Sequence, residues 1–184
     1  MIRYAIAAIA GLLAFGAPGA QALENENLLV ALPGGYKIGY HKNSPQGTIS
    51  EMIPAGETVE NWTEMVTVQI FLNMRDVTPA QYRERMQKLW GDACPGSAFS
   101  KVKEGIENGY ATLTWLQKCP VNKQTGKPEL TWMKAMQGKD SFYLVQKAYK
   151  FEPSAEQVTK WGGFLDSVRV CDTRLPDRPC KMGG

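Results

Sequence analysis

The feature that most constrains the fold is a change in hydrophobic period along the chain. In residues 63–72 the side chains alternate, with Val66, Val68 and Ile70 on one face, which predicts a strand. From Thr78 onward the period becomes helical. Thr78 with Gln81 forms a capping box, and an apolar stripe then runs to residue 93. The chain must therefore pair strands and cover them with helices.

The rest of the chain shows the same two kinds of pattern, alternating segments and one further helical segment. Strands are expected at 36–41 and 48–53, a short apolar run lies at 28–32, and four more strands are expected at about 98–103, 109–117, 129–137 and 141–149. Ser154 caps a second helix that ends near residue 168, and Gly162-Gly163 inside it predicts either a kink or close contact with the sheet. Short turns between strands indicate antiparallel pairing. The expected fold class is α+β, an antiparallel sheet of about seven strands flanked by two main helices.

The first 22 residues read as a secretory signal peptide. Arg3 supplies the positive start, an apolar run follows, and Ala20-Gln21-Ala22 is a cleavage signal, so cleavage is expected after Ala22. Residues 23–184 would form one α+β domain with no transmembrane segment, in the periplasm or secreted. The formal net charge of +3 and the scattered basic residues do not favour nucleic-acid binding.

Four cysteines fit an exported, oxidised chain. Three pairings can be drawn, and we favour Cys94–Cys119 with Cys171–Cys180 because each closes a local loop. The second bridge would pin the tail, residues 171–184. The sequence has no C-x-x-C motif and a single histidine, His41, so it predicts structural disulfides in place of a metal site or redox pair, and no cofactor.

A further pattern supports the fold. A strand pair leads to Ile53-Pro54-Ala55-Gly56-Glu57-Thr58-Val59-Glu60-Asn61-Trp62 and a long strand, and the chain closes with a capped helix ending in Phe164-Leu165-Asp166-Ser167-Val168. This resembles the Mog1/PsbP-like group, which includes exported bacterial proteins of the DcrB type. The resemblance implies a central antiparallel sheet flanked by helices and accessory or binding roles. It implies no shared activity and no functional residues.

Two candidate sites follow from the residues themselves. An aromatic groove for a partner or apolar ligand is expected around Trp115 and Trp132, with Tyr143 nearby and Lys134 and Lys147 at its rim; ordinary core tryptophans and surface lysines are the alternative. An acidic site at Glu57, Glu60 and Glu64 around Trp62 would suit a glycan hydrolase, whereas solvated loop carboxylates are the plainer interpretation.

No nucleophile motif accompanies His41, so the sequence favours a binding role over catalysis. The leading hypothesis is an accessory module for an envelope protein or a small apolar ligand. The alternative hypothesis is a small cell-wall or glycan hydrolase.

Overall fold

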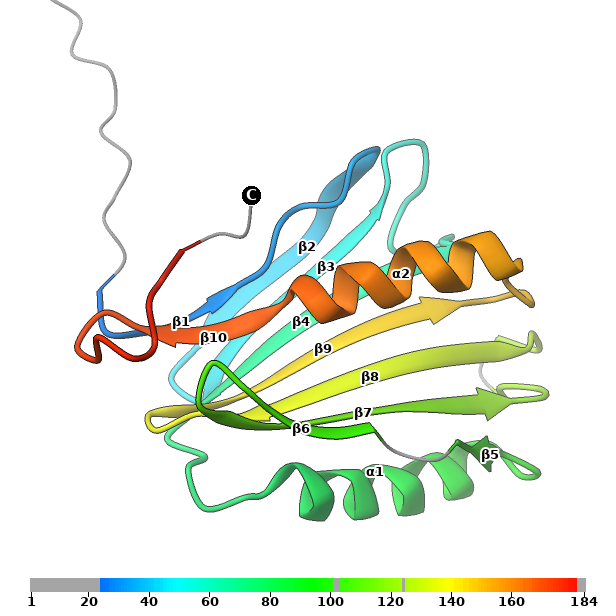
Figure 1. The fold of residues 1–184 in the computed structure, drawn as a ribbon. Coiled ribbons are helices and arrows are strands. Elements are labelled where there is room, and N and C mark those ends of the chain that lie inside the picture. Colours follow the sequence, from blue (N-terminus) through cyan, green and yellow to red (C-terminus); the bar gives the residue numbers. More distant parts are fainter. Residues whose placement is uncertain (1–23, 101–102, 124, 182–184) are drawn as a thin grey trace, which may run out of the picture.

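The computed structural model describes residues 24–100, 103–123 and 125–181, so the expected signal peptide lies outside the described residues. Its centre is an eight-stranded antiparallel sheet in the order β2-β3-β4-β9-β8-β7-β5, with β6 also pairing with β7. Figure 1 shows the two helices on opposite faces of this sheet, α2 above it and α1 below. The expected α+β class with two main helices is confirmed.

The elements follow the capped and alternating patterns of the sequence. The strands of the main sheet are β2 (Tyr36–Ser44), β3 (Gly47–Pro54), β4 (Glu64–Leu72), β5 (Ala98–Phe99), β6 (Lys103–Glu107), β7 (Tyr110–Cys119), β8 (Glu129–Gln137) and β9 (Ser141–Tyr149). The helices are α1 (Pro79–Ala93) and α2 (Ala155–Ser167), and both capping boxes, at Thr78 and Ser154, are formed.

Three details differ from the expectation. The apolar run after residue 27 contributes β1 (Glu26–Leu29), which pairs with β10 (Arg169–Asp172) in a separate two-stranded sheet. The strand expected at 98–103 is replaced by two short strands, β5 and β6. The β2–β3 loop is only two residues long, because Ser44 pairs directly with Gly47. Turn chemistry predicts where strands end more readily than which strand each one joins.

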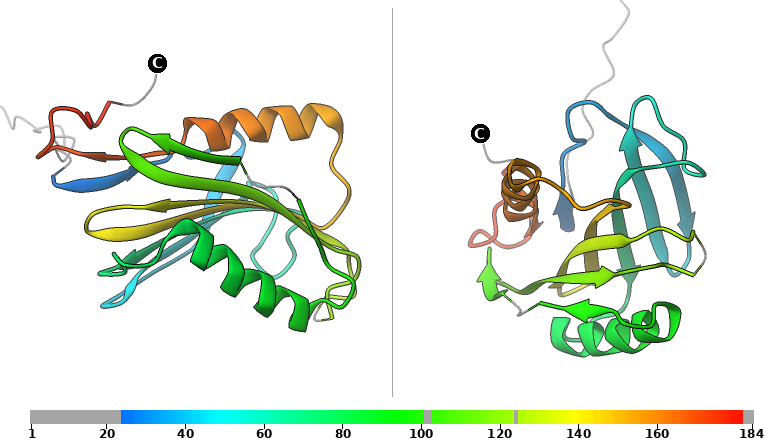
Figure 2. Two further views of the ribbon diagram at one scale, coloured as in Figure 1. Left: turned by 60° about the horizontal axis from the view of Figure 1, so that its bottom comes forward. Right: turned by 90° about the vertical axis from the view of Figure 1, so that its right-hand side faces the viewer.

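Each sheet face has its own apolar core. On the α2 side, Val66, Val145 and Tyr149 pack with Trp161 and Leu165 of α2. On the α1 side, the core strands pack against Tyr82 and Met86 of α1. Because strand side chains alternate between faces, each core takes every second residue of the central strands. Figure 2 shows the sheet from two further sides, with α1 and α2 against opposite faces and the β2–β3 end of the sheet lying away from α1.

Candidate functional site

The sheet divides the predicted aromatic groove between its two faces. Trp115 is fully buried in the α1-side core. Trp132 and Tyr143 belong to the α2-side core instead. Lys134 and Lys147 also point to the α2 side, since Lys134 bonds the α2 residue Leu165 and Lys147 lies over Trp161. Trp115 therefore cannot line a groove with the other four residues, which share one face.

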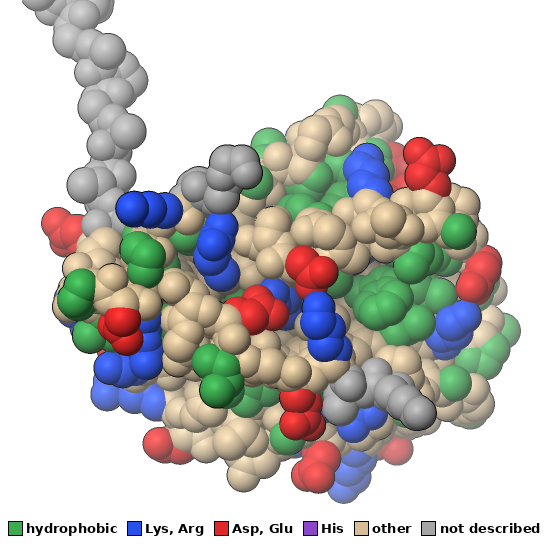
Figure 3. All heavy atoms as spheres, viewed as in Figure 1, with side chains coloured by type: hydrophobic (Ala, Val, Ile, Leu, Met, Phe, Trp, Pro, Cys, Tyr) green, Lys and Arg blue, Asp and Glu red, His purple; other side chains and the backbone are tan. Residues whose placement is uncertain are grey.

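The α2 face keeps a partly open apolar surface, which we call the α2-side trough. Leu116 of β7 lies directly opposite Trp132 of β8 in the strand register, and both are partly exposed. Along the same face, Leu130 and Phe151 line a hollow of about 330 Å³ at the end of the sheet. In Figure 3 hydrophobic side chains form the floor of a hollow beside α2, with acidic and basic side chains around it.

The glycines of α2 explain why this trough stays open. Asp166 bonds Lys103 of β6, and Gly162 precedes Asp166 by one turn, so Gly162 lies on the helix flank that faces β6 and β7. A Cβ at Gly162 or at Gly163 would meet no atom within 4 Å. The expectation of close helix–sheet contact at these glycines is therefore wrong. The missing side chains leave space that a larger residue would cover.

Two exposed ion pairs border the trough. Lys103 bonds Asp166 at 3.0 Å, and Lys118 bonds Glu152 at 3.1 Å. Lys103 pairs in register with Thr114 of β7, four residues from Lys118, so the pairs lie on the order of 13 Å apart at about 3.3 Å per residue. An apolar floor inside a charged border is the organisation of a small protein-binding surface.

Beside the trough, Lys147 is enclosed rather than exposed at a rim. Its side chain is 0% exposed, and its Nζ lies 2.6 Å from Glu64 Oε2 and 2.8 Å from Tyr36 Oη. The same nitrogen lies 3.7 Å from the Trp161 ring centroid and 4.6 Å from that of Tyr149. Burial lowers the pKa of Lys147 to about 8, against the opposing effect of Glu64. The cluster joins β2, β4, β9 and α2.

Lys134 is also buried, and it acts as a cap. Its Nζ donates to the carbonyl oxygens of Leu165 and Val168 at 2.8 Å and contacts Glu107 at 2.5 Å. Burial lowers the pKa of Lys134, while Glu107 opposes the shift. These bonds give a charged donor to the carbonyl of Val168, the C-cap residue of α2, and a second donor to the carbonyl of Leu165, which also accepts the Val168 N–H. Lys134 therefore ties α2 to the sheet and is not available at a groove rim.

The three acidic residues differ in their partners. Glu57 accepts hydrogen bonds from the backbone and hydroxyl of Thr63, and Glu64 binds Lys147, Tyr36 and Gln157. Glu60 is exposed. Burial raises the pKa of Glu57, but the Thr63 hydrogen bonds outweigh it and the net pKa is lowered. A glycosidase acid needs a raised pKa, so this geometry gives the hydrolase hypothesis no support.

The structure also places His41 and Trp62, the remaining residues considered from the sequence. His41 Nδ1 lies 2.7 Å from Ser50 Oγ on the exposed β2–β3 hairpin. Lys150 Nζ lies 3.8 Å from the centroid of the Trp62 ring. Within the described ranges, no three His, Cys, Asp or Glu side chains gather to hold a metal ion. Neither described helix combines the length and hydropathy needed to cross a bilayer.

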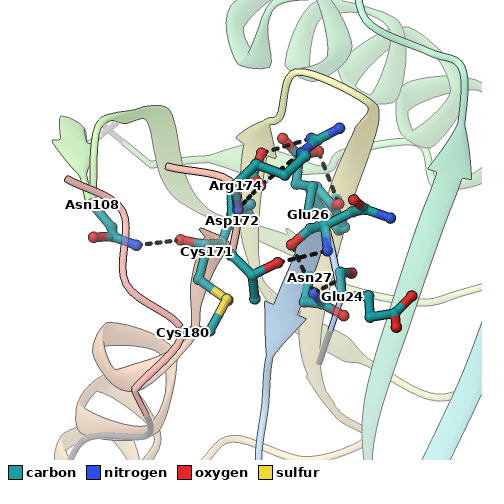
Figure 4. The surroundings of a disulfide bond; sticks show 12 residues. Glu24, Glu26, Asn27, Asn108, Cys171, Asp172, Arg174 and Cys180 are labelled. Atoms are coloured by element: carbon teal, nitrogen blue, oxygen red, sulfur yellow. Dashed lines mark hydrogen bonds and ion pairs between the residues drawn. A yellow bond between two sulfur atoms is a disulfide. The ribbon is translucent and has the colours of Figure 1, made fainter. Parts of the chain in front are cut away.

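The cysteines pair as favoured from their spacing. Cys94 bonds Cys119, and Cys171 bonds Cys180. Figure 4 shows the second bridge beside a polar network that sequence reasoning missed. Arg174 binds both Asp172 and Asp140, holding the tail loop against the β8–β9 turn. No pattern in the sequence marks these partners, because they are more than thirty residues apart or lie in a loop.

Glu26 completes this attachment. Its carboxylate accepts backbone hydrogen bonds from Lys139, Asp140 and Ser141, and a fourth from the Tyr143 hydroxyl at 2.9 Å. The pKa of Tyr143 is raised by burial and by the nearby Glu26 carboxylate. Tyr143, predicted as a groove residue, therefore anchors β1 to the β8–β9 turn.

Comparison with known proteins bears on the fold. No protein-family model matches the chain, and no curated protein matches its sequence. The structure is similar to that of the Ran-binding protein Mog1 of Saccharomyces cerevisiae, with 9% identity, a TM-score of 0.45 and coverage of 77% of this chain and 85% of that one.

Two further solved structures are similar. Cyanobacterial PsbP from Synechocystis sp. has 13% identity and a TM-score of 0.47 over 83% of this chain and 94% of that one. LpqN of Mycobacterium tuberculosis, described as involved in cell envelope biogenesis, has 13% identity and a TM-score of 0.43 over 86% and 87%. The chain thus has a weak, fold-level resemblance to Mog1/PsbP-like proteins, and these likenesses concern the fold alone.

Proposed function

We propose that this chain is a non-catalytic binding protein of the periplasm or of the secreted fraction, which holds apolar side chains of an envelope protein in the α2-side trough. The observation that carries the proposal is the partly exposed pair Leu116 and Trp132 inside a border of charged pairs. Tryptophan in a protected setting is typical of the residues that dominate binding energy.

The shape of the trough favours a protein over an enclosed small ligand. The hollow lined by Leu130 and Phe151 is open to solvent, whereas small-molecule sites bury most of the ligand. The spacing of about 13 Å between the border pairs suits two or three apolar side chains. The border pairs themselves are exposed, so their rearrangement costs at most about 1 kcal/mol each.

The two disulfides support an oxidising compartment, as the expected signal peptide does. Export to the periplasm would place the trough among envelope proteins. The chain would then act as an accessory factor, using affinity for a partner and no covalent chemistry.

Photo-crosslinking in the producing cell tests this proposal. A benzophenone amino acid replaces Trp132 in the full-length chain, and a matched variant carries it at Leu89, an exposed apolar residue on α1 across the sheet. We expect a protein adduct of one defined mass at position 132 and none at 89. Equal labelling at both positions, or none at 132, contradicts the proposal.

A second measurement separates the two kinds of occupant. Native mass spectrometry of the protein purified from the periplasm reports any retained small molecule. The occupant would be a small apolar ligand, and not an envelope protein, if two results coincide. The first is an adduct of a few hundred daltons that is lost in Trp132→Ala, and the second is the absence of a crosslinked protein. Circular dichroism of Trp132→Ala checks that the variant is folded.

A further inference from the structure

The sheet has one long open edge, and it lies away from the trough. Among the described strands, β2 pairs with β3 alone. Figure 2 shows it at the outer side of the sheet. In an antiparallel ladder, alternate residues of an edge strand point their backbone N–H and C=O groups outward. Alternate residues along the nine of β2 therefore present outward backbone groups, and among the described residues only the Tyr36 N–H has another partner, the Pro33 carbonyl at 3.0 Å.

The side chains of this edge are exposed as well. Every residue from Lys37 to Asn43 is exposed, including two large apolar ones, Ile38 at 58% and Tyr40 at 41%. Because residue pairing shifts between Ile38 and Tyr40, the regular part of the strand is Tyr40–Ser44. An added strand would find its unbroken backbone partners there.

The charged side chains of β2 itself are basic, while Glu51 of β3 lies opposite Tyr40 and Glu57 and Glu60 line a hollow with Lys37. No aspartate or glutamate occurs between Glu26 and Glu51, whereas Lys37 and Lys42 both lie on β2. Neither lysine forms an ion pair with any described residue. Two copies of this chain joined edge to edge would bring four lysines onto one ladder, which is unfavourable. The two unpaired lysines of the edge strand itself suit an acidic added strand.

The base of β2 is held rigid. Tyr36 is bonded to Glu64 and Lys147 beneath α2. At Gly39, a Cβ would lie 2.8 Å from atoms of Ile53 and Val59, so the backbone there is packed closely against its neighbours. An edge that is already ordered loses little conformational entropy when it accepts another strand.

We propose that β2 accepts an extended, acidic segment of a partner protein as an additional strand of the sheet, along Tyr40–Ser44. Backbone hydrogen bonds would supply the affinity, and Lys37 and Lys42 would select acidic side chains. This surface is independent of the α2-side trough, and the proposal does not rest on the proposed function.

The test uses a defined probe with the mature protein. The probe is a fluorescent nine-residue peptide that alternates valine and glutamate, with a matched peptide in which lysine replaces each glutamate. Fluorescence anisotropy measures affinity, and hydrogen exchange locates the protected amides. We expect the glutamate peptide to bind at least tenfold more tightly than the lysine peptide and to protect backbone amides within residues 40–44.

Two double variants control for net charge. Lys37→Glu with Lys42→Glu should weaken binding of the glutamate peptide at least tenfold. Arg85→Glu with Lys88→Glu makes the same charge change on the exposed side of α1 and should leave the affinity unchanged. Equal loss in both variants, protection outside β2, or no binding at millimolar peptide overturns the proposal. Binding to vesicles with anionic phospholipids but not to the peptide overturns it as well.

Discussion

Lys147 shows how far one residue's role depends on its surroundings. Alternation along β9 places it correctly on the face of Trp132 and Tyr143. The predicted role at a groove rim nevertheless does not match the geometry, because Tyr36 and α2 close over it and bury its ammonium group against Glu64. Its partners stabilise a buried charge of this kind. Removal of any one of them leaves buried polar or charged groups without a partner, which lowers the stability of the fold.

The first prediction concerns pH. The folded pKa of Lys147 is about 8, below the value near 10.4 of an unfolded lysine. Between these values the unfolded chain binds more protons, so this residue makes stability rise with pH. The raised pKa values of Tyr36 and Tyr149 act in the opposite direction only as unfolded tyrosines ionise near pH 10.

Urea unfolding between pH 7.5 and 9.5 measures this effect. The free energy of unfolding should gain a rising component with pH that Lys147→Met lacks. Glu64→Gln removes the charge that favours the ammonium form, so in that variant the rise should begin at a lower pH. Identical slopes in wild type and Lys147→Met would show that Lys147 does not titrate in this range.

The second prediction compares two lysines that both form ion pairs. Lys147→Met leaves Glu64 partly buried without its cation, and should lower the free energy of unfolding by about 3–5 kcal/mol. Lys118→Met breaks the exposed pair with Glu152 and should cost no more than about 1 kcal/mol. Urea unfolding at pH 7 gives both values. Similar costs would contradict the burial argument.

At the scale of elements, α2 carries a third prediction. Gly162→Ala and Gly163→Ala should each raise the free energy of unfolding by up to about 1 kcal/mol, because alanine favours the helix and the added Cβ meets no neighbour. Gly39→Ala is the contrast, since its Cβ would clash with Ile53 and Val59. Thermal unfolding should rise for the α2 variants and fall for Gly39→Ala.

The elements also show which local signals are sufficient. Helix starts at Thr78 and Ser154 are local events, set by a side chain and the backbone three residues later, and both occur as predicted. The pairing of β1, by contrast, is not set locally. Its pairing with β10 joins residues near opposite ends of the chain, helped by Glu26 at the β8–β9 turn. No local pattern can specify such a partner.

At the scale of the whole molecule, the two disulfides differ in access. Cys94 and Cys119 are both buried, whereas Cys180 is partly exposed in the tail loop. Thiol–disulfide exchange requires access to a sulfur atom. The fourth prediction is that mild reduction of the folded protein opens Cys171–Cys180 first.

Alkylation after brief reduction, followed by peptide mass spectrometry, reads out that order. We expect labels on Cys171 and Cys180 while Cys94 and Cys119 remain bonded. Simultaneous labelling of all four cysteines would mean that the molecule opens globally before either bridge is reduced. Urea at a concentration above the unfolding midpoint should abolish the difference, which provides the control.

The sequence by itself determined the α+β class, most strand and helix positions, the two capping boxes and the cysteine pairing preferred from loop length. Each of these depends on neighbours a few residues apart or on the closure of a short loop. The tertiary structure alone decided that Trp115 and Trp132 lie on opposite faces, that Lys134 and Lys147 are buried, and that the flank of α2 at Gly162 leaves a trough open. The physical reason is that burial and exposure depend on which distant element covers a given face, and periodicity within one strand or helix carries no information about that cover.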